Sequence, residues 1–203
     1  MPLRITDEER RARLVTRHHL ARSAASVGRA VVDVVASHSS DPATPYLAAW
    51  ARVGGFSVAD LDGALYDDRS VCRLHAMRRT LFVVPSALAE VFDGGAGRSV
   101  ARKERRRLEQ WLEGEVHDPA RWLRELESVV LAVLGAGSEH GTSDLTAAIP
   151  GLKTEISVGA GKWSAKVPVS SRLLFLPGME LKLVRAHPAG TWRSSQYRWA
   201  AAD

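Results

Sequence analysis

The chain has 203 residues, 45% of them hydrophobic and 25% charged, and its net charge of +5 and isoelectric point of about 9.8 favour a polyanionic partner. Its single cysteine, Cys72, excludes an internal disulfide and a cysteine-based zinc cluster, and indicates the cytoplasm. The longest apolar run, at residues 129–136, is too short to cross a bilayer, so we expect no membrane segment.

Four short helices are predicted in the first third of the chain. Thr6 begins a capping box, and Ser26 precedes apolar residues at helical spacing. Asp41 followed by Pro42 is typical of an N-cap with proline at the first helical position, and Ser57 starts another helix after a glycine pair. The expected helices cover approximately residues 7–20, 27–35, 42–50 and 58–65.

A two-stranded ribbon is predicted after these helices. Residues 71–77 and 79–84 alternate or run apolar, with β-branched and aromatic side chains, and Pro85 closes the second strand. Helices followed by a β-ribbon have the order of a winged helix. We therefore expect a first domain over residues 1–85, made of an N-terminal helix and a winged helix.

The same order is predicted again in the rest of the chain. A long helical stretch runs from Ser86 through Trp111, and a second helix covers about 120–134. A short helix capped by Thr142, a turn-rich link at 151–161, a helix within 169–175 and a final ribbon at 181–198 follow. The expected fold is mainly α with small β-ribbons (α+β), with a second winged helix over 86–203.

Three segments combine polar, basic and aromatic residues. The first is HSSDP at residues 38–42, followed by Trp50; the second is HAMRRTLFVVP at 75–85; the third is GTWRSSQYRW at 190–199. Together they resemble the winged-helix DNA glycosylases of the AlkZ and YcaQ type, over most of the chain. The resemblance implies tandem winged helices and an N-terminal portion or naturally short form, because family members continue beyond the third segment.

The resemblance also implies a DNA repair enzyme that hydrolyses the N-glycosidic bond of alkylated or crosslinked bases. Its expected partner is damaged double-stranded DNA. Family members carry a Gln-x-Gln or Gln-x-Asp pair that orients a water and steadies the developing sugar cation. The matching positions here are His38 and Ser40, which resemble a branch of the family with His-x-Ser or His-x-Thr.

The candidate catalytic residues are therefore His38, Ser40 and Asp41. Water attack at C1′ needs a group that aims the water and a polar or negative group near the oxocarbenium-like sugar. His38 can orient or deprotonate the water, Ser40 can hold it and Asp41 can supply charge. Two structural alternatives stay open: Asp41 as a helix N-cap, and His38 as a tie to carbonyls at the end of the second helix.

Arginines form most of the candidate DNA contacts. Arg98, Arg102, Arg105 and Arg106 share one stripe of a predicted helix, which can follow a phosphate backbone. The alternative is a solvated face, with Arg105 paired to Glu109. The candidate contacts are Arg78, Arg79, Thr80, Arg98, Arg102, Arg106, Lys162, Arg193, Gln196 and Arg198. His75 is interpreted as structural, and Tyr197 and Trp199 as core.

No cofactor, metal or nucleotide is expected, since GAGKW at 159–163 lacks the glycine spacing of a phosphate loop, and we expect a monomer. Two other functions stay open. A transcription regulator would place its third helix in the major groove, but Asp60, Asp62 and Asp67 would be repelled there. A non-enzymatic DNA-binding module could keep the fold without the glutamine pair.

Overall fold

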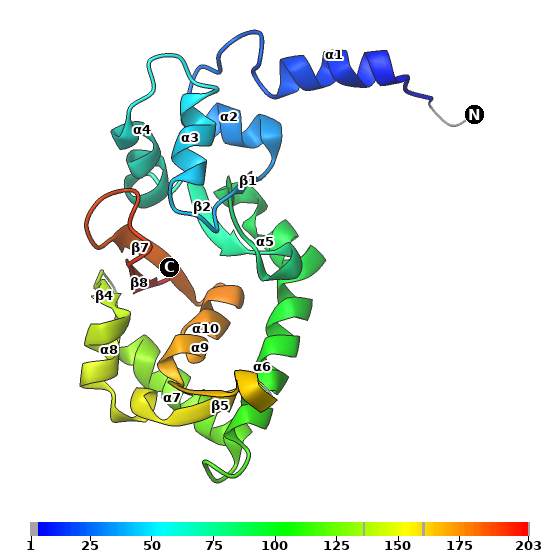
Figure 1. The fold of residues 1–203 in the computed structure, drawn as a ribbon. Coiled ribbons are helices and arrows are strands. Elements are labelled where there is room, and N and C mark those ends of the chain that lie inside the picture. The colour runs from blue at the N-terminus through cyan, green and yellow to red at the C-terminus, as the bar shows by residue number, and fades with distance from the viewer. Residues whose placement is uncertain (1–3, 136, 160, 203) are drawn as a thin grey trace. The chain divides into compact units, whose positions relative to one another are not determined.

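The computed structural model describes residues 4–135, 137–159 and 161–202, which divide into two compact units (Figure 1). The N-terminal unit contains the described residues up to Arg73 together with Thr80–Ala89. The C-terminal unit contains Leu74–Arg79 and the described residues from Glu90 onward. No helix within the described residues is long and apolar enough to cross a membrane.

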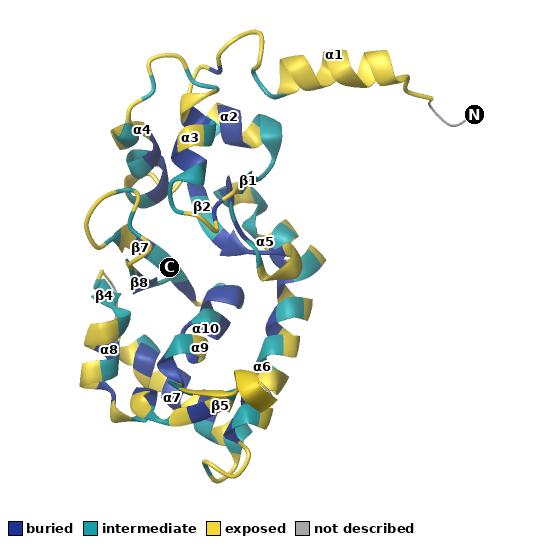
Figure 2. Cartoon of the chain, in the orientation of Figure 1, coloured by how far each residue is buried: buried dark blue, intermediate teal, exposed yellow. Residues whose placement is uncertain are grey.

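The predicted helices of the N-terminal unit are present. They are α1 (Asp7–Arg17), α2 (Val27–Val34), α3 (Thr44–Trp50) and α4 (Val58–Asp62), and α4 continues into a π-helical turn (Gly63–Asp67). The capping hydroxyls are confirmed, since Thr6 accepts from the Glu9 N–H at 3.2 Å and Ser26 from the Arg29 N–H at 3.2 Å. Helix α1 ends three residues early and buries no side chain (Figure 2).

A strand that the sequence pattern does not show lies between α2 and α3. This strand, β1 (Ser37–His38), pairs antiparallel with β3 (Leu81–Pro85), so that His38 lies opposite Phe82. The sheet order is β1-β3-β2, with β2 at Val71–His75. The placement of His38 at a helix end is therefore wrong: α2 ends at Val34, and the backbone after Val35 (φ 70°) is extended.

The turn between β2 and β3 also corrects the prediction. A 3₁₀ turn, Met77–Arg79, replaces the expected ends of both strands. Arg78 and Arg79 have positive φ angles of 57° and 62°, which a strand does not allow. The two arginines therefore lie on the turn between the strands.

The long helical stretch of the second half of the chain is present as consecutive short segments and one regular helix. A 3₁₀ turn (Ser86–Leu88), α5 (Ala89–Phe92) and a π-helical turn (Asp93–Gly97) lead into α6 (Arg98–Leu112). The later helices are α7 (Pro119–Val133), α8 (Thr142–Ala148), α9 (Ser170–Leu173) and α10 (Phe175–Met179), with a 3₁₀ turn at Pro150–Lys153. Gly141, not Thr142, is the N-cap of α8.

The C-terminal unit repeats the strand order of the first sheet. Its strands β4 (His140–Gly141), β7 (Leu183–Pro188) and β8 (Tyr197–Ala201) have the order β4-β8-β7. In both sheets a two-residue strand between helices pairs with the last strand of the ribbon, which is winged-helix topology. The predicted α+β fold with tandem winged-helix units is confirmed.

Two details of this unit differ from the prediction. The expected link at 151–161 contains a strand, β5 (Glu155–Val158), which pairs antiparallel with β6 (Ala165–Pro168). The final ribbon is interrupted, so that Arg193 and Gln196 lie in the loop between β7 and β8.

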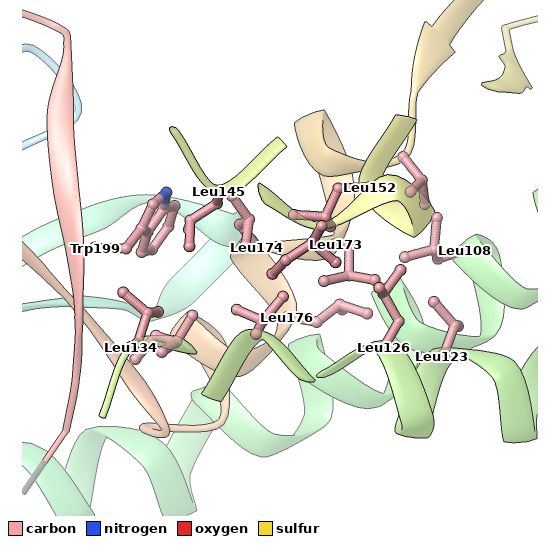
Figure 3. Packing of buried hydrophobic residues seen from close by; sticks show 14 of the residues in the cluster. Leu108, Leu123, Leu126, Leu134, Leu145, Leu152, Leu173, Leu174, Leu176 and Trp199 are labelled. Atoms are coloured by element: carbon pink, nitrogen blue, oxygen red, sulfur yellow. The ribbon is translucent and has the colours of Figure 1, made fainter. Parts of the chain in front are cut away.

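The core of the C-terminal unit is built largely from leucines of its helices, with Trp199 from β8 (Figure 3). Trp199 is 1% exposed and its indole N–H donates to the Thr142 hydroxyl at 3.1 Å, so its predicted core position is confirmed. Tyr197 is only partly buried and packs edge-on against Trp199, with ring centroids 5.1 Å apart. Complete burial of each leucine of this core contributes about 2 kcal/mol to the free energy of unfolding.

An ion-pair network lies beside this core. Arg105 on α6 donates to Glu127 on α7 at 2.8 Å and to Glu180, after α10, at 2.7 Å. Glu127 is 4% exposed, and this burial raises the pKa of its carboxyl. The positive charge of Arg105 lowers that pKa and so offsets part of the rise. Arg105 thus turns inward, and the alternative surface pair with Glu109 is wrong.

Replacing Arg105 by alanine should lower the free energy of unfolding by about 3 kcal/mol, because it leaves Glu127 buried without its cation. Urea denaturation followed by circular dichroism measures the effect. Arg102→Ala is the matched control on the same helix, since Arg102 is exposed, and it should change stability by less than about 0.5 kcal/mol. Equal stability of the two variants would contradict the role assigned to Arg105.

Candidate functional site

The predicted catalytic residues lie on one short segment that begins at the last residue of β1 and ends before α3. Along it, His38 is exposed, Ser39 is 2% exposed and Ser40 is exposed again. The Ser39 N–H donates to the Leu81 carbonyl at 2.8 Å, and the Leu81 N–H donates to the Ser40 hydroxyl at 3.4 Å. Strand β3 therefore contacts the segment at both residues: it pairs with His38 and donates to the Ser40 hydroxyl, and both residues are exposed.

Asp41 makes the contacts of a cap. One carboxylate oxygen accepts from the N–H groups of Ala43 at 2.9 Å and Thr44 at 3.1 Å, and from the Thr44 hydroxyl at 3.3 Å. Helix α3 begins at Thr44, two residues later than the Asp-Pro signal predicts, and Pro45 lies in its first turn. Asp41 is nevertheless exposed, and it directly follows Ser40 in the chain.

His38 borders an apolar pocket of about 280 Å³ within the N-terminal unit. Its ring packs edge-on against Phe82, with centroids 5.9 Å apart. The walls come mainly from α2 and α3 and include Val31, Val34, Pro45, Ala48 and Ala49. His18, at the end of α1, lines the same pocket. Sequence reasoning missed His18, because nothing in the local pattern connects it with a segment so far along the chain.

The predicted DNA contacts around the first ribbon have different partners. Arg79 donates to Glu104 on α6 at 2.9 Å. Arg78 has no ion pair among the described residues, and its side chain is exposed. Thr80 directly precedes β3 in the N-terminal unit, whereas both arginines belong to the C-terminal unit.

The predicted arginine stripe of α6 is shorter than expected. Arg98 is bound to Asp93, and Arg105 faces Glu127 and Glu180. Arg102 and Arg106 are exposed and form no ion pair within the described part of the chain. These two arginines are the members of the stripe that remain available to an external anion.

The remaining predicted contacts lie on loops and strands of the C-terminal unit. Lys162 is in a 3₁₀ turn (Gly161–Trp163) between β5 and β6, 5.5 Å from the Trp163 ring, and Trp163 is 78% exposed. Arg193 lies 5.9 Å from the Trp192 ring. Arg198 is exposed on β8, opposite Gly141. In the described ranges, no group of three or more His, Cys, Asp or Glu side chains could hold a metal ion.

Comparison with known proteins supplies the relatives of this chain. The family model for DNA glycosylase AlkZ-like proteins matches residues 31–203. The solved structure of Streptomyces sahachiroi DNA glycosylase AlkZ is similar, with a TM-score of 0.62 and 14% identity, over 94% of this chain and 47% of that one. This chain therefore spans about half the length of that protein, and the likeness concerns the fold. A comparison with curated proteins finds no match. Because the family model covers most of its length, the chain belongs to the AlkZ-like DNA glycosylase family.

Proposed function

We propose that this protein is a DNA glycosylase that releases alkylated or crosslinked bases from double-stranded DNA by attack of water at C1′. The observation that carries the proposal is that His38 and Ser40 are both exposed, two residues apart, on a segment that β3 holds in place. Membership of the family supports the reaction class. The protein would act as a cytoplasmic monomer.

In the proposed reaction, the N-glycosidic bond breaks and its electron pair leaves with the base. His38 orients the attacking water and accepts its proton. The Ser40 hydroxyl accepts from the Leu81 N–H, so its own proton is available to hold the water oxygen. Asp41 steadies the positive sugar with its negative charge. The segment at 37–42 contains no lysine, so no Schiff base forms in this scheme, and no cofactor takes part.

Phosphate contacts would hold the DNA. Arg102 and Arg106 have no anionic partner among the described residues, and they lie one helical turn apart on α6. Arg78 has the same unpaired character, while Arg79 and Arg98 would have to exchange a carboxylate for a phosphate. Thr80, Lys162, Arg193, Gln196 and Arg198 complete the proposed contacts.

A non-enzymatic DNA-binding module is the second candidate. The observation that favours it is that Asp41 accepts from the N–H groups of Ala43 and Thr44 at the start of α3, which gives this residue a structural role without catalysis. A transcription regulator, which would place α4 in the major groove as its recognition helix, is less well supported. Helix α4 and the turn after it carry Asp60, Asp62 and Asp67, which phosphates would repel. Asp60 and Asp62 also have internal partners, in the Ser57 N–H and the Tyr46 hydroxyl.

His38→Ala should reduce base release about a hundredfold, the usual scale for the loss of a positioned general base, while DNA affinity and folding stay intact. The measurement is single-turnover release of an alkylated purine from duplex DNA. His117→Ala is the matched control, because His117 is exposed and lies in the C-terminal unit. If the parent protein binds DNA but releases no base from any alkylated or crosslinked duplex, the non-enzymatic module becomes the better account.

Two substitutions of Asp41 separate capping from charge. Asn caps helices as well as Asp does, so Asp41→Asn should keep the parent stability, whereas Asp41→Ala should lose about 1 kcal/mol. If the negative charge steadies the sugar cation, Asp41→Asn should still release base at least tenfold more slowly than the parent. Thermal unfolding and base release are measured on both variants. Full activity of Asp41→Asn would leave Asp41 as a cap alone.

Binding to undamaged duplex DNA should weaken steeply with salt, since each phosphate contact releases counterions. Removing two such contacts in the double variant Arg102→Ala with Arg106→Ala should reduce the log-log slope by about 2. The control with the same change of net charge is Arg121→Ala with Arg124→Ala on the exposed side of α7. Fluorescence anisotropy at several salt concentrations gives the slope for each double variant. If the two double variants have the same slope, Arg102 and Arg106 do not contact DNA phosphates.

A further inference from the structure

The C-terminal unit contains a second pocket, of about 290 Å³. Trp111, Phe175, Leu176 and Met179 give it apolar walls, and three arginines, Arg78, Arg79 and Arg172, are also lining residues. Glu104 and His75 also line it. The pocket therefore combines flat aromatic and aliphatic surface with several positive charges.

The positive charges are only partly compensated. Glu104 accepts from Arg79 at 2.9 Å and lies 3.7 Å from Arg107, so its carboxylate is already shared by two guanidinium groups. Arg78 and Arg172 are both exposed and form no ion pair within the described ranges. An anion in the pocket would thus meet two arginines that are not engaged elsewhere, and guanidinium groups bind phosphate oxygens through two parallel hydrogen bonds.

The backbone at Arg78 and Arg79 is held in a costly conformation. Both residues have left-handed φ angles, 57° and 62°, which non-glycine residues rarely adopt. Strained backbone of this kind persists where the surrounding structure holds it, and it gathers at ligand sites. Arg78, on this turn, is a lining residue of the pocket.

The apolar side of the pocket suits a planar ring. Phe175 packs edge-on against His75, with ring centroids 5.9 Å apart, and the Arg107 guanidinium lies 5.6 Å from the Trp111 ring. His75 is 9% exposed; its burial, and then the charge of Arg185, lower its pKa to about 4. A neutral imidazole offers one donor and one acceptor, as the edge of a base requires.

We propose that this pocket binds one nucleotide unit of DNA, with its phosphate on Arg78 and Arg172 and its base against Trp111 and Phe175. It is a binding site apart from the His38 segment, and the pocket binds a nucleotide of the substrate strand, not a cofactor. The choice of a DNA nucleotide, among phosphorylated aromatic ligands, rests on the proposed function. The size of the pocket, near the lower end of the range for small-molecule sites, fits a single nucleotide.

Calorimetric titration of the full chain with 2′-deoxyadenosine 5′-monophosphate, deoxyadenosine and inorganic phosphate tests the proposal. The monophosphate should bind with a dissociation constant below about 1 mM, and each half-ligand at least tenfold more weakly. Arg172→Gln should weaken monophosphate binding about tenfold. Arg124→Gln, which removes an exposed arginine of α7 outside the pocket, should leave it unchanged.

Arg78→Gly provides a variant that should fold normally, because glycine adopts a φ of 57° without strain. Its melting temperature should stay at or above that of the parent, while monophosphate binding weakens about tenfold. Equal weakening by Arg172→Gln and Arg124→Gln would mean general charge attraction and would overturn the proposal. Phosphate binding as tight as monophosphate binding would overturn the role of the rings.

Base release from alkylated duplex DNA, measured on the same samples, separates this proposal from the proposed function. A parent protein that binds the monophosphate but releases no base refutes the glycosylase and leaves the pocket standing. A parent protein that releases base but does not bind the monophosphate refutes the pocket alone. Slower base release by Arg172→Gln than by Arg124→Gln would link the pocket to the reaction.

Discussion

The pairing of a two-residue strand with the last strand of a ribbon is the constraint on which both units depend. In the first sheet, β1 pairs with β3, and from the end of β1 onward His38 and Ser40 are exposed while Ser39 is buried. In the second sheet, β4 pairs with β8, where His140 lies opposite Trp199. Gly141 is then the N-cap of α8 and Thr142 its first residue, and the Thr142 hydroxyl accepts a hydrogen bond from the Trp199 indole N–H. The same strand pairing therefore holds exposed polar residues in the N-terminal unit and positions a buried core residue, Trp199, in the C-terminal unit.

Helix α6 shows how one residue type takes opposite roles within a single turn. Arg105 faces Glu127 and Glu180 beside the core, whereas Arg102 and Arg106 point to solvent. Adjacent positions on a helix differ in direction by about 100°, so the change from Arg105 to Arg106 is enough to exchange a buried partner for water. The same guanidinium group can therefore form an ion pair beside the core, as in Arg105, or attract a phosphate at the surface, as proposed for Arg102 and Arg106.

The sequence predicts the helices and the order of the elements well, because caps and apolar spacing are local signals. Thr6 and Ser26 cap as their spacing predicts, and Trp199 is in the core. The short strands are different: two residues are too few for alternation to show, so β1 and β4 depend on pairing partners far along the chain. For the same reason the local pattern predicts a helix end near His38 instead of a strand. The pockets that His18 and His38, or Arg172 and Arg78, line together cannot be predicted from it either.

Departures from local rules occur beside both proposed sites. Val35 is the β-branched residue with a positive φ among the described residues, and it turns the chain from α2 into β1 just before His38. The hydroxyl of Ser39, between the two proposed catalytic residues, is buried without a hydrogen-bond partner in the described structure. Arg78 and Arg79 combine left-handed backbone with positive charge at the second pocket. Each departure lowers the stability of the fold. A single substitution, such as Arg78→Gly or Ser39→Ala, would remove that cost if the residue had only a structural role. Such costs are expected where a segment must hold polar groups in one orientation, and here they coincide with the residues that the proposed chemistry uses.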